Sequence, residues 1–132
     1  MYTLRSVKES DLNDLFDLSN LVTFINLPPD KEIIRSKIAS AIKSFKDPYS
    51  ELWKNYYIFV MEDTIQDRVV GASMIHAQHG TEAEPHFYLK VSNEHKFSST
   101  INTGFIHGTL KLGYDTDGPT EIGGLVLHPD YR

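Results

Sequence analysis

The chain has 132 residues, of which 13 are basic and 18 are acidic, and its formal net charge is -5. A chain of this size can hold one domain with a real hydrophobic core, and its 40% hydrophobic and 23% charged content are ordinary for a soluble globular protein. The acidic balance argues against nonspecific nucleic-acid binding, which needs a basic surface.

Cysteine is absent from the sequence. This excludes disulfides, thiolate metal sites and a cysteine nucleophile within the chain, and it is compatible with the cytoplasmic location that we expect. The N-terminal residues carry no long apolar segment, and no stretch approaches the length of a membrane span. We therefore expect no membrane partner.

The first third of the chain predicts a strand and two helices. Residues 2–7 have the pattern of a short strand, and Ser10 is the expected N-cap of a helix whose apolar residues recur at helical spacing up to Val22. Two prolines then interrupt the pattern, and Asp30 is the expected N-cap of a second amphipathic helix. The apolar stripes of both helices predict core positions.

The middle of the chain predicts strands. Residues 56–62 and 68–75 are rich in β-branched and aromatic side chains and are joined by a short polar link, so an antiparallel hairpin is expected. Residues 87–91 form a possible strand, and residues 104–112 fit either a strand or a short helix. The polar stretch 92–103 gives no assignment, and residues 114–119 predict a turn.

The last segment, residues 120–132, is an apolar run that ends in a Pro-Asp turn, which predicts a buried central strand. Gly123 and Gly124 inside it predict a bulge, or the close approach of another backbone or a ligand. The order of elements predicts an α+β fold with a mainly antiparallel sheet and two N-terminal helices. Without repeats or low-complexity tracts, we expect a single domain over residues 1–132.

The pattern Leu-Val-Leu-His-Pro-Asp-Tyr-Arg at residues 125–132 resembles the central strand of the GNAT acyltransferases. The resemblance implies the N-terminal half of a GNAT-like fold. In that superfamily, the arginine opens a Gly-rich loop at a helix N-terminus that holds the coenzyme A pyrophosphate. The sequence stops at Arg132, so we expect this loop and the C-terminal half to be missing from the chain.

Several stretches together resemble one family, the arginine N-succinyltransferases of bacterial arginine catabolism. They are residues 4–12, 26–28, 59–63 with 69–71, 84–88, and 115–132. The resemblance covers essentially the whole chain but only the N-terminal part of the family's longer chain. The sequence departs from it at Gly123 and Gly124, where we expect bulkier residues in the family.

The resemblance implies transfer of a succinyl group from succinyl-CoA to the α-amine of arginine. A base must deprotonate the amine, N–H groups must stabilise the thioester oxygen, and the pyrophosphate must be anchored. Glu121 is the candidate base, because a glutamate near the start of this strand has that role in the histone-acetyltransferase branch of the superfamily. A strand-edge glutamate that is solvated or paired with a lysine explains the same residue.

The resemblance assigns the acyl donor to the same strand. The pantetheine arm would bind backbone groups of Leu125, Val126 and Leu127. A gap at the two glycines would let this arm approach the strand. An ordinary buried strand with a glycine bulge explains these residues equally. Arg132 would open the pyrophosphate loop, although a solvated terminal arginine is the simpler interpretation.

A guanidinium prefers carboxylates in bidentate geometry, and Asp115 and Asp117 are the candidate partners of the arginine substrate. Acidic loops are usually only solvated, which is the alternative. His76 and His79 lie three residues apart on a strand-to-loop segment, where two imidazoles do not share a helix face as a zinc site needs. We expect no metal.

Two other functions stay open. One is a CoA-dependent N-acyltransferase that acts on a different amine, and the other is a non-catalytic binding or assembly module. A half fold should expose one edge of the fold's central strand at or near residues 125–127, and unpaired apolar edges tend to pair with other chains. We therefore expect a homo-oligomer, or pairing with a C-terminal half.

Overall fold

The structure is a computed structural model that describes all 132 residues. Contacts divide the chain into two compact units. The first is formed by Met1–Gln78 and Pro119–Arg132, and the second by His79–Gly118. Each unit is described by itself.

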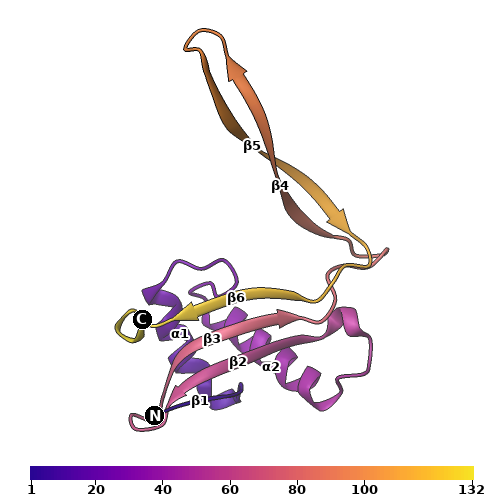
Figure 1. Ribbon diagram of the computed structural model, residues 1–132. Coiled ribbons are helices and arrows are strands. Elements are labelled where there is room, and N and C mark those ends of the chain that lie inside the picture. Colours follow the sequence, from indigo (N-terminus) through magenta and orange to yellow (C-terminus); the bar gives the residue numbers. More distant parts are fainter. The chain divides into compact units, whose positions relative to one another are not determined.

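The first unit is a four-stranded antiparallel sheet with two helices on one face (Figure 1). The strand order is β1-β2-β3-β6, and every neighbouring pair is antiparallel. The elements are β1 (Tyr2–Ser6), α1 (Leu12–Leu21), α2 (Lys31–Lys46), β2 (Tyr56–Asp63), β3 (Arg68–His76) and β6 (Glu121–Leu127), with short 3-10 turns at Glu9–Asp11, Leu52–Lys54 and Pro129–Tyr131. This confirms the predicted α+β class, both helices and the β2–β3 hairpin.

The two helices begin in different ways. Asp30 caps α2 as predicted, because its carboxylate accepts hydrogen bonds from the backbone N–H groups of Glu32 (2.9 Å) and Ile33 (3.1 Å). The predicted cap at Ser10 is wrong. Ser10 lies inside a 3-10 turn that delays the start of α1 to Leu12.

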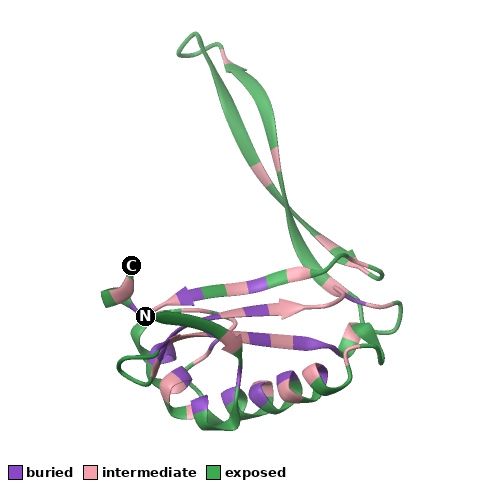
Figure 2. Ribbon diagram, turned by 60° about the horizontal axis from the view of Figure 1, so that its bottom comes forward, coloured by how far each residue is buried: buried purple, intermediate pink, exposed green.

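The core lies between the helices and the sheet face that they cover, and Figure 2 shows the buried residues along this contact. Leu15 of α1, Ile34 of α2 and Ile58 of β2 are fully buried there. Burial of side chains of this size contributes about 1.5–3 kcal/mol each. The helical stripes therefore serve as core, as the sequence predicted.

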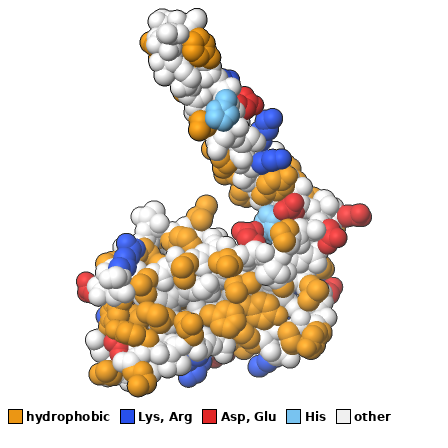
Figure 3. Space-filling model, in the orientation of Figure 1, with side chains coloured by type: hydrophobic (Ala, Val, Ile, Leu, Met, Phe, Trp, Pro, Cys, Tyr) orange, Lys and Arg blue, Asp and Glu red, His pale blue; other side chains and the backbone are white.

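The opposite face of the sheet keeps apolar side chains in solvent. Leu4 is 75% exposed and Leu125 is 80% exposed. Figure 3 shows hydrophobic side chains gathered over β1, β2, β3 and β6 on this face. An exposed apolar area of this kind marks an interaction surface more often than a free one.

The last strand lies at one edge of this sheet, as expected for a half fold that exposes one edge of this strand. β6 pairs with β3 alone, and β2 and β3 occupy the centre. Val126 is 6% exposed, whereas Ile122 is 72% exposed. The apolar run of β6 thus covers the core on one face and meets solvent on the other, so its composition does not require a central place.

The second unit is a long antiparallel hairpin of β4 (His86–Ser98) and β5 (Thr103–Asp115). The possible strand at residues 87–91 is confirmed, and residues 104–112 are strand, not helix. The unassigned stretch 92–103 completes both strands and their turn, in which Asn102 has a positive φ of 48°. Asparagine is among the side chains that tolerate this conformation best.

Candidate functional site

The start of β6 places Glu121 in a row of polar side chains. Glu121 lies opposite His76 of β3, and His76 lies opposite Tyr56 of β2. Residues directly opposite in an antiparallel sheet share one face, and the rings of His76 and Tyr56 are 4.8 Å apart between centroids. From α2, the Lys37 Nζ atom lies 5.0 Å from the Tyr56 ring centroid. We call these four residues the Glu121 cluster.

Burial shifts the pKa values of two members of the Glu121 cluster. Tyr56 is 7% exposed, and its hydroxyl is buried without a hydrogen-bond partner. Desolvation raises the pKa of Tyr56 to about 12 and lowers the pKa of Lys37 below its usual value. The phenol therefore stays protonated at neutral pH, whereas the lysine loses its proton more easily than a free lysine.

β6 carries the bulge that its glycines predict. Gly124 pairs with Met74 and Ile122 pairs with Ile75, which leaves Gly123 as an extra residue on β6. Bulges are common next to active sites, where they redirect the chain locally. The bulge lies two residues after Glu121.

The gap expected at the glycines is filled on their side-chain side. A Cβ atom on Gly124 would collide with the Phe24 ring and lie 3.2 Å from the Met74 Sδ atom. A Cβ atom on Gly123 would lie 3.1 Å from the His76 ring. The expectation of a gap for a cofactor arm is therefore wrong there, because neighbouring rings use the space.

The backbone of β6 has an open outer edge. The N–H group of His128 donates to the carbonyl of Val70 on β3 at 2.8 Å. Because N–H directions alternate along an antiparallel strand, Val126 also turns its N–H group toward β3, whereas Leu125 and Leu127 turn theirs outward. β6 has no other neighbour in the sheet. Two of the three predicted backbone contributors thus face an edge that a ligand or strand can use.

Arg132 is exposed and follows the 3-10 turn at the end of β6. The turn is fixed by Tyr131, whose hydroxyl donates to the Asp63 carboxylate at 3.2 Å and whose ring packs edge-on against Tyr2. This fixed turn places the Arg132 backbone at the same end of the strand as Leu127.

Asp115 and Asp117, the candidate substrate contacts, belong to the second unit. The Asp115 Oδ2 atom lies 3.0 Å from His79 Nδ1, and the Gly118 N–H group donates to the His79 carbonyl at 2.9 Å. These contacts close the base of the hairpin. Asp117 is exposed. Asp115 thus has a structural role that the sequence did not predict.

Residues 2–132 match the family model described as arginine N-succinyltransferase beta subunit, AstA. The chain belongs to the AstA family. This confirms the resemblance found in the sequence.

Relatives of this AstA chain are longer. It is 30% identical over 134 residues to the arginine N-succinyltransferase of Yersinia enterocolitica and 31% identical over 137 residues to that of Yersinia pestis. Each alignment covers 100% of this chain and 38% of the relative. The chain thus spans well under half the length of these curated relatives.

A solved structure shares the architecture of this AstA chain. It is subunit AI of the arginine/ornithine succinyltransferase from Pseudomonas aeruginosa, with a TM-score of 0.74 at 25% sequence identity. The likeness covers 98% of this chain and 40% of that chain. It confirms the α+β fold with two helices and mostly antiparallel sheets.

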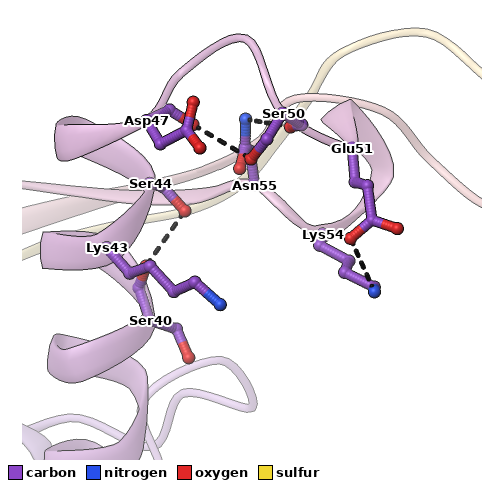
Figure 4. Close-up of a pocket in the computed structure, with 8 residues that line it drawn as sticks. All are labelled: Ser40, Lys43, Ser44, Asp47, Ser50, Glu51, Lys54 and Asn55. Atoms are coloured by element: carbon purple, nitrogen blue, oxygen red, sulfur yellow. Dashed lines mark hydrogen bonds and ion pairs between the residues drawn. The ribbon is translucent and has the colours of Figure 1, made fainter.

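A pocket of about 240 Å³ lies between the end of α2 and the turn before β2 (Figure 4). No predicted site residue lines it. Its polar groups bind one another: Asn55 donates to two backbone carbonyls of the preceding loop, and Lys54 pairs with Glu51 at 2.7 Å. The pocket is therefore explained by the packing of a helix end and not by substrate binding.

Two further features of the chain concern metal sites and membrane spans. Its histidine, aspartate and glutamate side chains form no group of three or more that could hold a metal ion. None of its helices has both the length and the apolar character needed to cross a membrane.

The substitution Gly124→Ala is expected to lower the free energy of unfolding by about 2 kcal/mol, because the new methyl group must displace Phe24 from its packing against the core. Thermal and urea unfolding would measure the change. In a Gly124→Ala/Phe24→Leu double variant the loss should be smaller than the sum of the single losses.

Gly104→Ala is the matched control, because the nearest atom to its added Cβ is 3.9 Å away, on the hairpin. It should change stability by less than about 0.5 kcal/mol. Additive effects of the Gly124 and Phe24 substitutions would contradict the proposed contact.

Proposed function

We propose that the chain is part of an arginine N-succinyltransferase, which transfers succinyl from succinyl-CoA to the α-amine of arginine. The observation that carries this proposal is the family match over residues 2–132. The curated relatives bear the same enzyme name. We further propose that the two units act together as a single GNAT-like domain, 1–132, in the cytoplasm.

In this proposal Glu121 is the general base. An ammonium has no lone pair, so Glu121 takes a proton from the α-amine, directly or through a water molecule. The nitrogen then attacks the thioester carbonyl, the new C–N bond forms and the C–S bond breaks. The sulfur of coenzyme A leaves as a thiolate and receives the second proton, which the nitrogen loses as it becomes an amide. The position opposite His76 supports this role, because an imidazole beside a carboxylate can orient it or pass the proton on.

The open edge of β6 is the proposed site of the acyl donor. The amide groups of a pantetheine arm can pair with an unpaired strand edge, and Leu125 and Leu127 offer outward N–H groups there. An outward N–H group of this kind can also stabilise the oxyanion that forms on the thioester oxygen when the amine attacks. Val126 contributes packing, since its side chain is buried. Arg132 opens the loop that holds the pyrophosphate.

We propose Asp115 and Asp117 as the partners of the arginine guanidinium. Asp117 is exposed, and Asp115 is partly exposed beside His79. A guanidinium can bind a carboxylate through two parallel hydrogen bonds. This role is compatible with the contact to His79, because each carboxylate oxygen can accept more than one hydrogen bond.

The decisive experiment uses a chimera that joins residues 1–132 to the part of the Yersinia enterocolitica relative outside the matched segment. Product is detected by mass spectrometry after incubation with succinyl-CoA and arginine. We expect N-succinylarginine to form only when both substrates are present. A chimera that unfolds cooperatively but transfers no acyl group would overturn the proposal.

The same assay tests the rival enzyme function. Acetyl-CoA and other amines replace succinyl-CoA and arginine one at a time. Preference for another acyl donor or another amine would identify a different CoA-dependent N-acyltransferase.

An assembly module without catalysis is the second candidate. It is favoured by the open edge of β6 and by the exposure of Leu4 and Leu125 on the uncovered sheet face. Both features suit a homo-oligomer or pairing with a C-terminal half. Calorimetric titration of the 132-residue chain with succinyl-CoA separates the candidates. Saturable heat favours the enzyme. Its absence would mean that the chain by itself is an incomplete acyltransferase, and the assembly module would then be the leading candidate.

A further inference from the structure

One face of the β4–β5 hairpin is mainly apolar and exposed, and its polar side chains are Asn93 and His95. Alternate residues of a strand share a face, and the cross-strand pairs Phe87–Tyr114, Leu89–Leu112 and Val91–Leu110 lie on the same side. Further along, Phe97 and Ile106 join them. All eight side chains are between 59% and 68% exposed. We call this set the apolar hairpin face.

The other face of the hairpin is mainly polar. It carries the pairs Lys90–Lys111, Ser92–Thr109 and Glu94–His107. Lys96 lies 3.9 Å from Glu94 on the same face. The hairpin therefore has the two-sided character of one layer of a β-sandwich, with one face for a core and one face for water.

Nothing within the second unit covers the apolar hairpin face. None of the buried core residues comes from His79–Gly118. A two-stranded hairpin without such cover is marginally stable in water at best. Each strand of this hairpin has thirteen residues and is longer than usual. A hairpin of this length needs a partner that covers the apolar hairpin face if it is to be stable.

The size of the apolar hairpin face matches a stable interface. Eight mostly exposed apolar side chains, five aliphatic and three aromatic, present on the order of 800 Å². A standard protein interface buries about 800 Å² on each partner. The apolar hairpin face alone reaches this size.

We propose that the apolar hairpin face docks on the same face of a second copy of the chain. The face contains no Lys, Arg, Asp or Glu, so two copies of a chain with net charge -5 meet there without like charges in contact. A second hairpin has equal length and a polar outer side. Stacked under a two-fold axis, the two form a small sandwich with both polar faces in water. This deepens the proposed homo-oligomer and is independent of succinyl transfer.

The test compares two neighbouring substitutions on β5. Leu110→Lys places a charge on the apolar hairpin face, whereas Thr109→Lys adds the same charge to the polar face. Sedimentation equilibrium of the 132-residue chain at micromolar concentrations measures the dissociation constant. We expect a wild-type dimer, a Thr109→Lys dimer of similar affinity, and a dissociation constant raised at least roughly 100-fold by Leu110→Lys, because each copy must bury an unpaired ammonium.

Hydrogen exchange provides a second readout that does not depend on how well Leu110→Lys folds. In the wild type, protection of the β4 and β5 amides should rise with protein concentration, while that of α2 should not. A wild-type monomer whose hairpin amides are protected at every concentration would overturn the proposal. So would a dimer that both substitutions weaken equally, or one that Leu125→Lys at the β6 edge abolishes and Leu110→Lys leaves intact. None of these outcomes bears on whether the chimera transfers succinyl.

Discussion

Replacement of Glu121 by glutamine is expected to lower the rate of arginine succinylation by the chimera roughly 100- to 10,000-fold. Glutamine keeps the size and hydrogen-bonding capacity of the side chain beside His76 but cannot accept a proton at neutral pH. The loss should fall mainly on the catalytic rate constant, because the substitution removes a proton acceptor and not a binding surface. Steady-state assays of product formation measure it.

The pH dependence separates a base from a positioning residue. As the pH rises, more of the arginine α-amine in solution is already neutral, so the deficit of Glu121→Gln should shrink. Glu32→Gln is the control, since the Glu32 side chain is 81% exposed and pairs only loosely with Arg35 at 3.5 Å. It should leave the rate unchanged. A deficit of Glu121→Gln that stays constant with pH would contradict the role of Glu121 as base.

The sequence predicted the parts of the fold that depend on local signals. The Asp30 cap, the stripe from Ile34 along α2 and the short link between β2 and β3 each act within a few residues. The order of strands depends on contacts far apart in the chain. For this reason the sequence alone does not give the strand order, and the open edge of β6 was expected only from the resemblance to half of a larger fold.

The hairpin shows how pairing overrides local preference. Asn93 and Glu94 have low strand propensity, and together with the polar Ser92 they left the second half of β4 unassigned in the sequence. In the structure Ser92, Asn93 and Glu94 pair with Thr109, Gly108 and His107, respectively, so the register of the hairpin decides their conformation. Strand propensity is weaker evidence than the partner strand, which a single sequence does not show.

The candidate site was predicted only in part. Resemblance to a known strand selected Glu121, but His76, Tyr56 and Lys37 were missed. The strand pattern could place His76 at the end of β3. Its position opposite Glu121 follows only from the register between β3 and β6, which the bulge at Gly123 shifts by one residue. The contact of Phe24 with Gly124 likewise depends on tertiary structure, which a single sequence does not show.

Replacement of Arg5 by methionine is expected to lower the free energy of unfolding by about 3 kcal/mol. Arg5 holds two carboxylates in bidentate geometry. It contacts Asp11 at 2.8 and 2.9 Å and Glu62 at 2.9 and 3.0 Å, and so joins β1 to the turn before α1 and to β2. The Asp11 side chain is only 5% exposed. Without Arg5 its charge loses its main partner, although the Lys8 N–H group still donates to it at 2.7 Å.

The effect should depend on pH in a defined direction. The hydrogen bonds from Arg5 lower the pKa of Glu62. The unfolded chain therefore binds this proton at a higher pH than the folded chain does. The stabilisation by Arg5 is complete above the unfolded pKa of a glutamate, about 4.3, and is lost as the pH falls through the lower folded value. The difference in stability between the wild type and Arg5→Met should consequently narrow as the pH is lowered below about 4.

Urea unfolding at several pH values measures both effects. Arg35→Met is the matched control, because Arg35 makes only the exposed pair with Glu32 on α2. Such pairs contribute about 0.5 kcal/mol or less, so its stability should follow the wild type at every pH. If Arg5→Met lowered the free energy of unfolding no more than Arg35→Met does, Asp11 and Glu62 would have to find other partners in the folded chain. The position of β1 beside β2 would then rest on backbone pairing and not on Arg5.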